Sequence, residues 1–327
     1  MKTFSLAFLL LLLYTFGFPT TDSQPAPAEN NPGVANIVFR SADGGQTWQD
    51  ISEGLPANVR EEDIQRDGFF ANGNGFYLRT GNGIYHSQRN AIFSFWTKEV
   101  FPAKQSRIAP GSNGILAYNY EGQILQKISG TGTWKPVYAN FHEGAIHTVF
   151  ETAGGSVFIG CNTGLFKSTN NGKTWKQVQA GGWVMKLAES NGILLATSQR
   201  GIIRSADGGE NWEAVISEGG VGIAVENIQG GFAAITFNAK LTTRRVRTSY
   251  DGGKTWQPID AGLPASLLTA SIVQVGENFF CGHPNGIFRS SDKGKTWKLI
   301  LPAIKDKVFN LFVSGNLVYA VPRNGGC

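Results

Sequence analysis

The stretch Arg40–Trp48 reads RSADGGQTW, and four later stretches carry nearly the same text. These are KSTNNGKTW (167–175), RSADGGENW (204–212), TSYDGGKTW (248–256) and RSSDKGKTW (289–297). Two degenerate copies, HSQRNAIFSFW (86–96) and KISGTGTW (127–134), keep the final Trp. The seven Trp residues of this series lie at 48, 96, 134, 175, 212, 256 and 297, so they recur every 37 to 48 residues. A period of this length indicates one supersecondary unit that is repeated around a common core.

Each copy combines residue types that build a tight turn. An Asp carboxylate accepts hydrogen bonds from backbone N–H groups a few residues further on, and a glycine such as Gly45 permits a positive φ. The Trp ring then packs on the sheet beneath. We therefore expect the motif to be structural, with these turn and anchor residues: Asp43, Trp48, Asn170, Trp175, Asp207, Trp212, Asp251, Trp256, Asp292 and Trp297. A metal-binding or catalytic Asp would need other ligands beside it, and the motif supplies none.

The text between the motifs predicts four short strands in each unit. Before and after Trp212 these are VMKLAES, ILLATS, GIIRS and WEAVI. The composition agrees, because 42 glycines and only 16% charged residues exclude a coiled coil or a charged disordered chain. The chain begins with two outer strands, NIVFRS and WQDI, and ends with two inner ones, VFNLFVS and NLVYAVP. We predict an all-β, seven-bladed propeller over residues 34–327, whose last four-stranded antiparallel blade is closed by both termini.

The motif S-x-D-x-G-x-T-W resembles the Asp-box, or BNR, repeat of the sialidase-like β-propellers, and the resemblance covers the whole chain after residue 33. In character the short blades look like the photosystem II assembly-factor and sortilin-type propellers. That resemblance implies a non-catalytic platform that binds a protein partner or a carbohydrate. The fold by itself does not select an activity, because unrelated functions share it.

The N-terminal residues predict export. Lys2 precedes an apolar run from Phe4 to Phe18, which is too short for a comfortable bilayer span. We assign residues 1–23 to a signal peptide and 24–33 to a linker; a signal anchor is the alternative. The mature chain then has no membrane span and is periplasmic or secreted. Its net charge of +5 forms no basic stripe, so we expect no nucleic-acid partner.

Three cysteines, Cys161, Cys281 and Cys327, cannot form a full disulfide framework, although one bridge is open to them. Cys161 and Cys281 fall near the ends of second strands, where core thiols are more common than nucleophiles. The Cys and His residues show no zinc-binding spacing, and no glycine-rich stretch has the context of a phosphate loop. We expect neither a metal nor another cofactor.

One face of the ring collects the loops from strand four to strand one and from strand two to strand three. The Asp-box turns lie on the opposite face. Sorting polar and aromatic residues by this rule gives the ligand-binding candidates Glu61, Glu62, Asp63, Arg66, Arg107, Tyr120, His147, Trp183, Arg200 and Arg323. The same face carries His283 and the stretch NAKLTTRR (238–245). Because Arg presents a fork that suits carboxylate or phosphate, a weakly anionic ligand is a hypothesis for this face, and the alternative is that these are solvated loop residues.

A sialidase-like or xyloglucanase-like glycoside hydrolase is the second interpretation. Sialidases of this fold hold the substrate carboxylate with three Arg residues, and Arg107, Arg200 and Arg323 are the corresponding candidates, with Tyr120 or Tyr319 nearby. The Arg motif typical of that family is absent. Glu61, Glu62 and Asp63 share one loop, which disfavours the opposed carboxylate pair that ordinary glycosidases need.

Overall fold

The computed structural model describes residues 36–60, 64, 68–73, 75–88, 96–99, 106–112, 114–128, 133–138 and 141–325. These residues form 28 β-strands and no α-helix. Accordingly, none of them belongs to a helix that could span a membrane.

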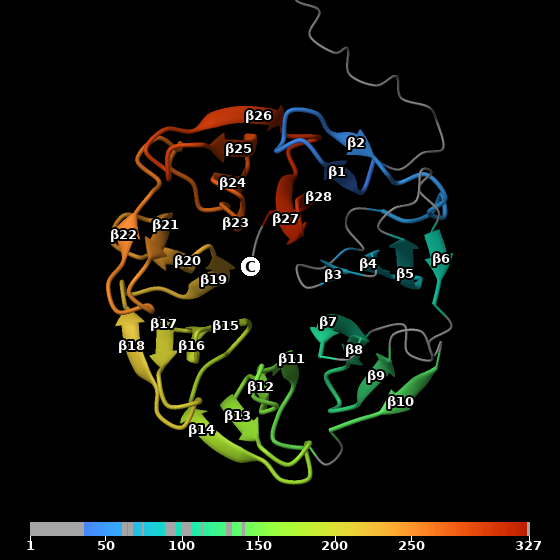
Figure 1. Cartoon of the computed structure of the whole chain (residues 1–327), viewed down its shortest axis with the longest axis vertical. Helices are drawn as coiled ribbons and strands as arrows, with labels where there is room; N and C mark the ends of the chain where they lie inside the picture. The colour runs from blue at the N-terminus through green and yellow to red at the C-terminus, as the bar shows by residue number, and fades with distance from the viewer. Residues whose placement is uncertain are drawn as a thin grey trace, which may run out of the picture. The chain divides into compact units, whose positions relative to one another are not determined.

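The strands form seven four-stranded antiparallel sheets, the blades, which surround a central channel (Figure 1). Blades 1 to 3 consist of β3 (Phe69–Asn72), β4 (Gly75–Thr80), β5 (Gly83–Gln88) and β6 (Trp96–Lys98); β7 (Arg107–Gly111), β8 (Gly114–Tyr118), β9 (Ile124–Ile128) and β10 (Trp134–Pro136); and β11 (Ile146–Glu151), β12 (Val157–Cys161), β13 (Gly164–Ser168) and β14 (Lys176–Ala180). Blades 4 to 6 consist of β15 (Leu187–Ser190), β16 (Ile193–Ser198), β17 (Gly201–Ser205) and β18 (Glu213–Ile216); β19 (Gly222–Ile228), β20 (Gly231–Asn238), β21 (Thr243–Ser249) and β22 (Gln257–Pro258); and β23 (Ser271–Val275), β24 (Asn278–His283), β25 (Gly286–Ser290) and β26 (Lys298–Pro302).

Blade 7 joins the two ends of the fold. Its strands are β27 (Val308–Ser314), β28 (Leu317–Arg323), β1 (Phe39–Ser41) and β2 (Gln49–Asp50), from the channel outward. β1 pairs antiparallel with β28, so that Phe39 lies opposite Ala320 and Arg40 opposite Tyr319. This pairing confirms the predicted closure, and it covers the outer edge of β28, which would otherwise be unpaired.

The Asp-box turns connect the third and fourth strands of their blades. In blade 4, Asp207 Oδ1 accepts the backbone N–H groups of Glu210 and Asn211, both at 3.0 Å. Ser205 Oγ donates to Asp207 Oδ1 at 2.7 Å and accepts the Gly209 N–H at 2.9 Å. Asp43, Asp251 and Asp292 accept equivalent bonds, and Asn170 Oδ1 accepts the Thr174 N–H in blade 3. One side chain therefore satisfies several backbone donors that the turn would otherwise leave without a partner.

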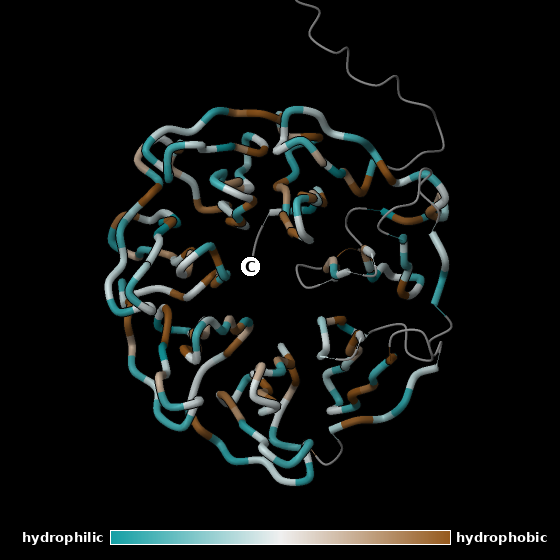
Figure 2. The backbone as a smooth tube through the Cα atoms, in the orientation of Figure 1, coloured by the Kyte–Doolittle hydropathy of each residue, from teal (hydrophilic) through white to brown (hydrophobic). Residues whose placement is uncertain are grey.

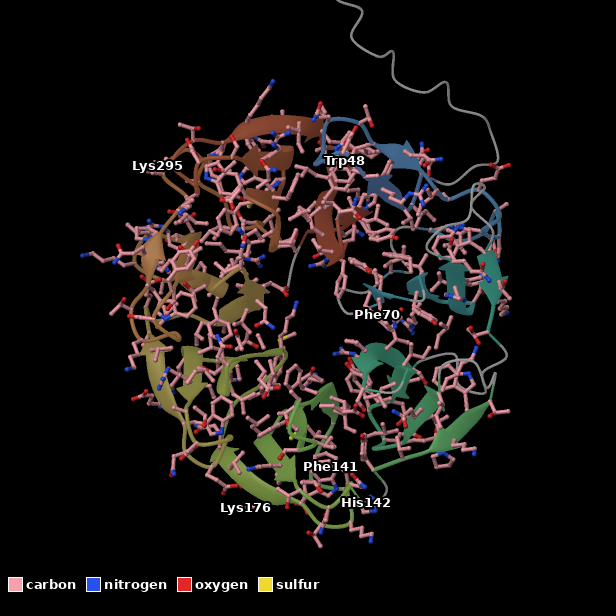
Figure 3. The ribbon with its side chains drawn as sticks, viewed as in Figure 1. Trp48, Phe70, Phe141, His142, Lys176 and Lys295 are labelled. Carbon is pink, nitrogen blue, oxygen red and sulfur yellow. The ribbon has the colours of Figure 1, made fainter. Side chains whose placement is uncertain are left out.

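The seven Trp residues of the series link each blade to the one before it. The described core divides into seven clusters, and each cluster lies between two neighbouring blades and includes one Trp from the later blade. Trp96 Nε1 donates to Ile51 O of blade 7, and Trp297 Nε1 donates to Ile259 O after blade 5, both at 2.7 Å. Figure 2 shows hydrophobic stretches along the strands of each blade, and Figure 3 shows Trp48 where blade 7 meets blade 6. Each Trp ring therefore packs between the sheets of two neighbouring blades, and not only against the sheet of its own blade.

A glycine in the Asp-box touches the preceding blade. Gly209 has φ +86°, and a Cβ built on it would lie 2.4 Å from the Phe158 ring of blade 3. Gly45 is similar, because a Cβ there would lie 2.7 Å from both Phe280 and Ile300 of blade 6. These positions need glycine for two reasons, its backbone conformation and its lack of a side chain.

We predict that Gly209→Ala lowers the free energy of unfolding by about 2–4 kcal/mol, through backbone strain together with overpacking against Phe158. Gly192→Ala is the matched control, since Gly192 also has a positive φ (+75°) but a Cβ there meets nothing within 4 Å. The control should lose only about 1 kcal/mol, the cost of strain alone. Urea unfolding of the three proteins measures the difference, and equal losses in both variants would contradict the close contact between blades.

Asp292 makes stability depend on pH in the acid range. Hydrogen bonds from the Thr296 hydroxyl and N–H and from the Ser290 hydroxyl lower the pKa of Asp292 from 3.8 to about 2. A carboxyl group whose pKa is depressed by folding contributes stability above its unfolded pKa, and that contribution disappears as the pH falls through the folded value. The urea midpoint should therefore fall between about pH 4 and pH 2.

Asp292→Asn should keep the fold but flatten this decline, because Asn170 already fills the same position in blade 3. Asp292→Ala should be less stable than Asp292→Asn at pH 7, because alanine cannot accept the turn bonds. An acid decline in Asp292→Asn as steep as in the unmodified protein would refute the assigned role of the carboxylate.

Candidate functional site

The antiparallel blades place two kinds of connection on one side of the ring, called here the loop face: those from the second to the third strand of a blade, and those from the fourth strand to the first strand of the next blade. The Asp-box turns lie on the other side. Among the sequence-predicted site residues, Arg107, Tyr120, His147, Trp183, Arg200 and Arg323 are on the loop face. Glu61, Glu62, Asp63 and Arg66 lie outside the described residues.

Four of the predicted residues form a continuous cluster, called here the rim cluster: Arg107, Tyr120, His147 and Trp183. Arg107 Nη1 donates to His147 O at 3.0 Å, and Arg107 Nη2 donates to the Tyr120 hydroxyl. The Arg107 guanidinium carbon lies 4.9 Å from the centre of the Tyr120 ring. The His147 ring then lies 6.0 Å from Tyr120 and 5.6 Å from Trp183, measured between ring centres. The cluster thus runs across the starts of blades 2, 3 and 4.

The turn that carries Tyr120 is closed by Asn119. Asn119 Oδ1 accepts the N–H groups of Glu121 and Gln123 at 3.1 and 2.9 Å, and the Asn119 N–H donates to Gln123 O at 3.1 Å. This pattern is an Asx-type turn, which favours Asn at its first position. It presents Tyr120 outward, and 46% of that side chain is exposed.

Trp183 is held between two glycines and a buried valine. Gly181 and Gly182 have φ of +77° and +84°, and the Gly181 N–H donates to Thr163 O at 2.9 Å. Val184 is 1% exposed and packs in the core between blades 3 and 4. Trp183 itself is 50% exposed. A large apolar ring is therefore displayed to solvent at a fixed place on the loop face.

The Arg residues of the loop face have different environments. Arg200 is exposed, in a turn whose Gln199 side chain lies beside Gly182 and so close to Trp183. Arg323 is 8% exposed and donates to Asn324 O at 3.2 Å. Arg107, Arg200 and Arg323 belong to blades 2, 4 and 7, no two of which are neighbours. Of these three residues, Arg107 is the one that donates hydrogen bonds within the rim cluster.

The stretch 238–245 is shorter as a loop than its sequence indicates. Asn238 ends β20 and Thr243 begins β21, so only residues 239–242 form the connection. Arg245 makes a two-bond ion pair with Asp260, at 2.7 and 3.0 Å, and Arg244 is buried and donates to Thr269 O at 2.9 Å. Arg244 and Arg245 therefore make contacts within the fold, whereas Lys240 of the same stretch is exposed.

His283 is a structural residue in this fold. Burial lowers its pKa, so the ring is neutral near pH 7. Its Nδ1 accepts the Asn285 N–H at 3.1 Å, which leaves Nε2 to donate to Pro264 O at 3.0 Å. Both ring nitrogens are used within the fold, and the side chain is not free to exchange protons with a ligand.

A cavity of about 430 Å³ occupies the central channel and is lined by the first strands of all seven blades. Its two described carboxylates, Glu151 and Glu226, both have partners. Glu226 pairs with Lys186 of the neighbouring blade, and Glu151 accepts bonds from the Tyr138 hydroxyl and the Ser112 N–H. These partners could not be predicted from the sequence, because the ion pair joins residues 40 positions apart on two strands whose relative offset the repeat period does not define.

Other chemistry finds little support in the described residues. They contain no group of three or more His, Cys, Asp or Glu side chains that could hold a metal ion. Cys161 and Cys281 are free and buried, in blades 3 and 6, and burial raises the pKa of the Cys281 thiol. A buried neutral thiol is a poor nucleophile. Cys327 lies outside the described residues.

Two repeat families match the sequence. Residues 247–258 match the BNR/Asp-box repeat, and residues 287–300 match a second model described as BNR-Asp box repeat. No curated protein matches the chain.

Several solved structures share the fold. The GH74 xyloglucanase from Xanthomonas campestris has a TM-score of 0.63 and 14% identity, over 85% of this chain and 53% of its own. The extracellular domain of the putative one component system BT4673 from B. thetaiotaomicron has a TM-score of 0.58 and 13% identity, over 79% of this chain and 36% of its own. The chain thus spans about half of the xyloglucanase and about a third of the sensor domain. At these identities the likeness concerns the fold alone: the protein is a seven-bladed β-propeller, and two of its segments match the BNR/Asp-box repeat.

Proposed function

We propose that this protein is an exported, non-catalytic propeller that binds a glycan through the rim cluster on its loop face. The observation that carries the proposal is the pair of half-exposed aromatic side chains, Tyr120 and Trp183, linked through His147. Export rests on the signal-like residues 1–23 and is part of the proposal. A protein partner on the same face is the competing outcome.

The rim cluster has the physical properties of a sugar-binding surface. The C–H face of a pyranose is apolar and packs well on an aromatic ring, and Trp and Tyr add polar groups at the ring edge. Arg107 fixes Tyr120 from two directions, by a hydrogen bond to its hydroxyl and by its position over the ring. Rings that are held before binding lose little conformational freedom when a ligand arrives, which favours affinity.

The turn that carries Arg200 lies next to the residue before Trp183, and we assign the charge of the binding surface to Arg200 for this reason. Its turn packs against Gly182, the residue before Trp183, and its side chain is exposed. A guanidinium in this place suits a carboxylate on the sugar, because the two planar groups form paired hydrogen bonds. An acidic sugar is therefore the preferred ligand.

A glycoside hydrolase remains the second candidate, supported by the fold shared with the GH74 xyloglucanase. The two described channel carboxylates are engaged with other groups, which favours the binding function. Incubation with xyloglucan and with a fluorogenic sialoside decides between the two. Turnover that Arg107→Ala or Arg200→Ala abolishes would establish the enzyme.

Trp183→Ala should weaken binding to the preferred glycan at least about tenfold, because it removes the larger stacking surface. The panel consists of polygalacturonate, sialyllactose and xyloglucan, measured by titration calorimetry. Tyr250→Ala is the control, since Tyr250 is similarly exposed (54%) but lies in an Asp-box turn on the opposite face. Equal affinity in the Trp183 and Tyr250 variants would place the glycan elsewhere, and binding to no glycan together with capture of a protein partner would favour the competing outcome.

Arg200→Gln should reduce binding of an acidic glycan about threefold to tenfold, and it should weaken the dependence of affinity on salt. Binding of neutral xyloglucan, if detectable, should not change. Lys305→Gln is the control, because Lys305 is exposed on the loop face just before blade 7, which is not a neighbour of blade 4. An Arg200 variant that retains full affinity and salt dependence for the acidic glycan would remove Arg200 from the site.

A further inference from the structure

A second cavity, of about 540 Å³, lies between blades 2 and 3, which are neighbours in the ring (Figure 1). Its lining includes Ser112, in the turn from β7 to β8, and Asn171, in the Asp-box turn of blade 3. Both residues are exposed, and both turns lie on the side of the ring opposite the loop face. The cavity therefore opens to solvent away from the rim cluster, and its volume is within the size range of small-molecule pockets.

Glu151 is the one charged residue in the described lining of this cavity. Its Oε1 accepts a hydrogen bond from the Tyr138 hydroxyl, and its Oε2 accepts the Ser112 N–H. Because both donors also line the cavity, the carboxylate is placed at its wall. The two donors are neutral, and no Lys or Arg of the described ranges forms an ion pair with Glu151. A carboxylate has about four acceptor positions, so this one can accept further bonds.

Tyr138 is held in an unusual conformation beside this carboxylate. Its φ is +50°, which is rare for a bulky residue. The Asp-box turn of blade 3 packs directly on its backbone, since a Cβ built on Gly172 would lie 2.4 Å from Tyr138 Cα. Backbone strain of this kind is concentrated at sites that hold a ligand. Burial and the hydrogen bond to Glu151 raise the pKa of Tyr138, so the hydroxyl stays protonated near pH 7 and the negative charge stays on Glu151.

Glu189 offers an internal comparison. Its Oε2 accepts the Ala153 N–H at 2.8 Å, which joins blade 4 to the first turn of blade 3 as Glu151 joins blade 3 to that of blade 2. Glu189 is not among the residues that line this cavity. A contact between blades thus accounts for one oxygen of Glu151, but it does not account for the bond to Tyr138 or for the cavity around the pair.

The rest of the described lining is uncharged. It combines the amide residues Gln126 and Asn171 with the apolar residues Val137 and Val157. One carboxylate without His or Cys beside it suits an organic cation better than a metal ion, which needs more ligands of its own kind. A primary ammonium group carries three N–H donors and a positive charge, and both match a carboxylate whose other partners are neutral.

We propose that this cavity binds a small organic ammonium ion with an apolar body, whose N–H groups donate to the carboxylate of Glu151. The site lies on the opposite side of the ring from the rim cluster, and it does not depend on the glycan proposal.

Two fluorinated probes test the site, observed by fluorine NMR with the full-length protein at pH 7 in about 0.15 M salt. 4-Fluorobenzylamine carries the ammonium group, and 4-fluorobenzyl alcohol is its neutral counterpart of nearly the same shape. We expect the amine to bind at least about fivefold more tightly, because it adds one hydrogen-bonded ion pair in a partly buried site. Binding of neither probe at millimolar concentration, or equal binding of both, would overturn the proposal without any need for a variant.

Glu151→Gln locates the effect. Glutamine keeps an oxygen for the Ser112 N–H and an amide group for the Tyr138 hydroxyl, but it removes the charge. The variant should lose the preference for the amine and bind the alcohol as before. Glu189→Gln is the matched control, because it makes the same change at the next contact between blades, and it should keep the preference. A preference that persists in Glu151→Gln, or that disappears equally in Glu189→Gln, would overturn the proposal.

Discussion

The structure depends on one kind of corner, in which an Asp or Asn side chain closes a turn and the following Trp enters the space between two blades. The same turn has two functions. Within the blade it satisfies backbone N–H groups, as Asp207 does for Glu210 and Asn211. Between blades it brings a glycine such as Gly209 against Phe158 and places Trp212 in the shared core. Because the contact cannot form without the turn, local conformation and packing between repeats stabilise each other.

This coupling explains how the loop face can hold a precise arrangement of side chains. The rim cluster takes Arg107 and Tyr120 from blade 2, His147 from blade 3 and Trp183 from the connection into blade 4. Arg107 reaches across to the backbone of His147, so the geometry of the cluster depends on the offset between two blades. The core between blades 2 and 3 sets that offset through Phe141, Ile146 and Trp175. Because the rim cluster comes from three blades, its rigidity depends on the packing between those blades.

The fold could be predicted almost completely from the sequence, because its determinants are local and repeated. The Asp-box motif predicts the turn, and the spacing of the Trp residues predicts the period. The first repeat has only outer strands and the last has only inner strands, which predicts that the two share one blade. The loop face could also be predicted, since strand direction alternates and assigns each connection to a side. Arg107 shows the limit, because its side chain turns to Tyr120 and to a backbone oxygen some 40 residues away. The hydrogen-bond partners of such a side chain depend on the offset between neighbouring blades, and the repeat period of the sequence carries no information about that offset.

The central claim is that seven repeats, tied by these corners, form one closed and cooperative ring. Hydrogen exchange measured by mass spectrometry under native conditions tests it directly, by comparing peptides 38–52 and 317–323 in blade 7 with peptide 193–205 in blade 4. The account predicts that the most protected amides of all three peptides open with the same free energy, because pairing of β1 with β28 makes the two ends part of the same unit. If residues 38–52 exchange freely while 193–205 stay protected, the ring is open at blade 7 and the account is wrong.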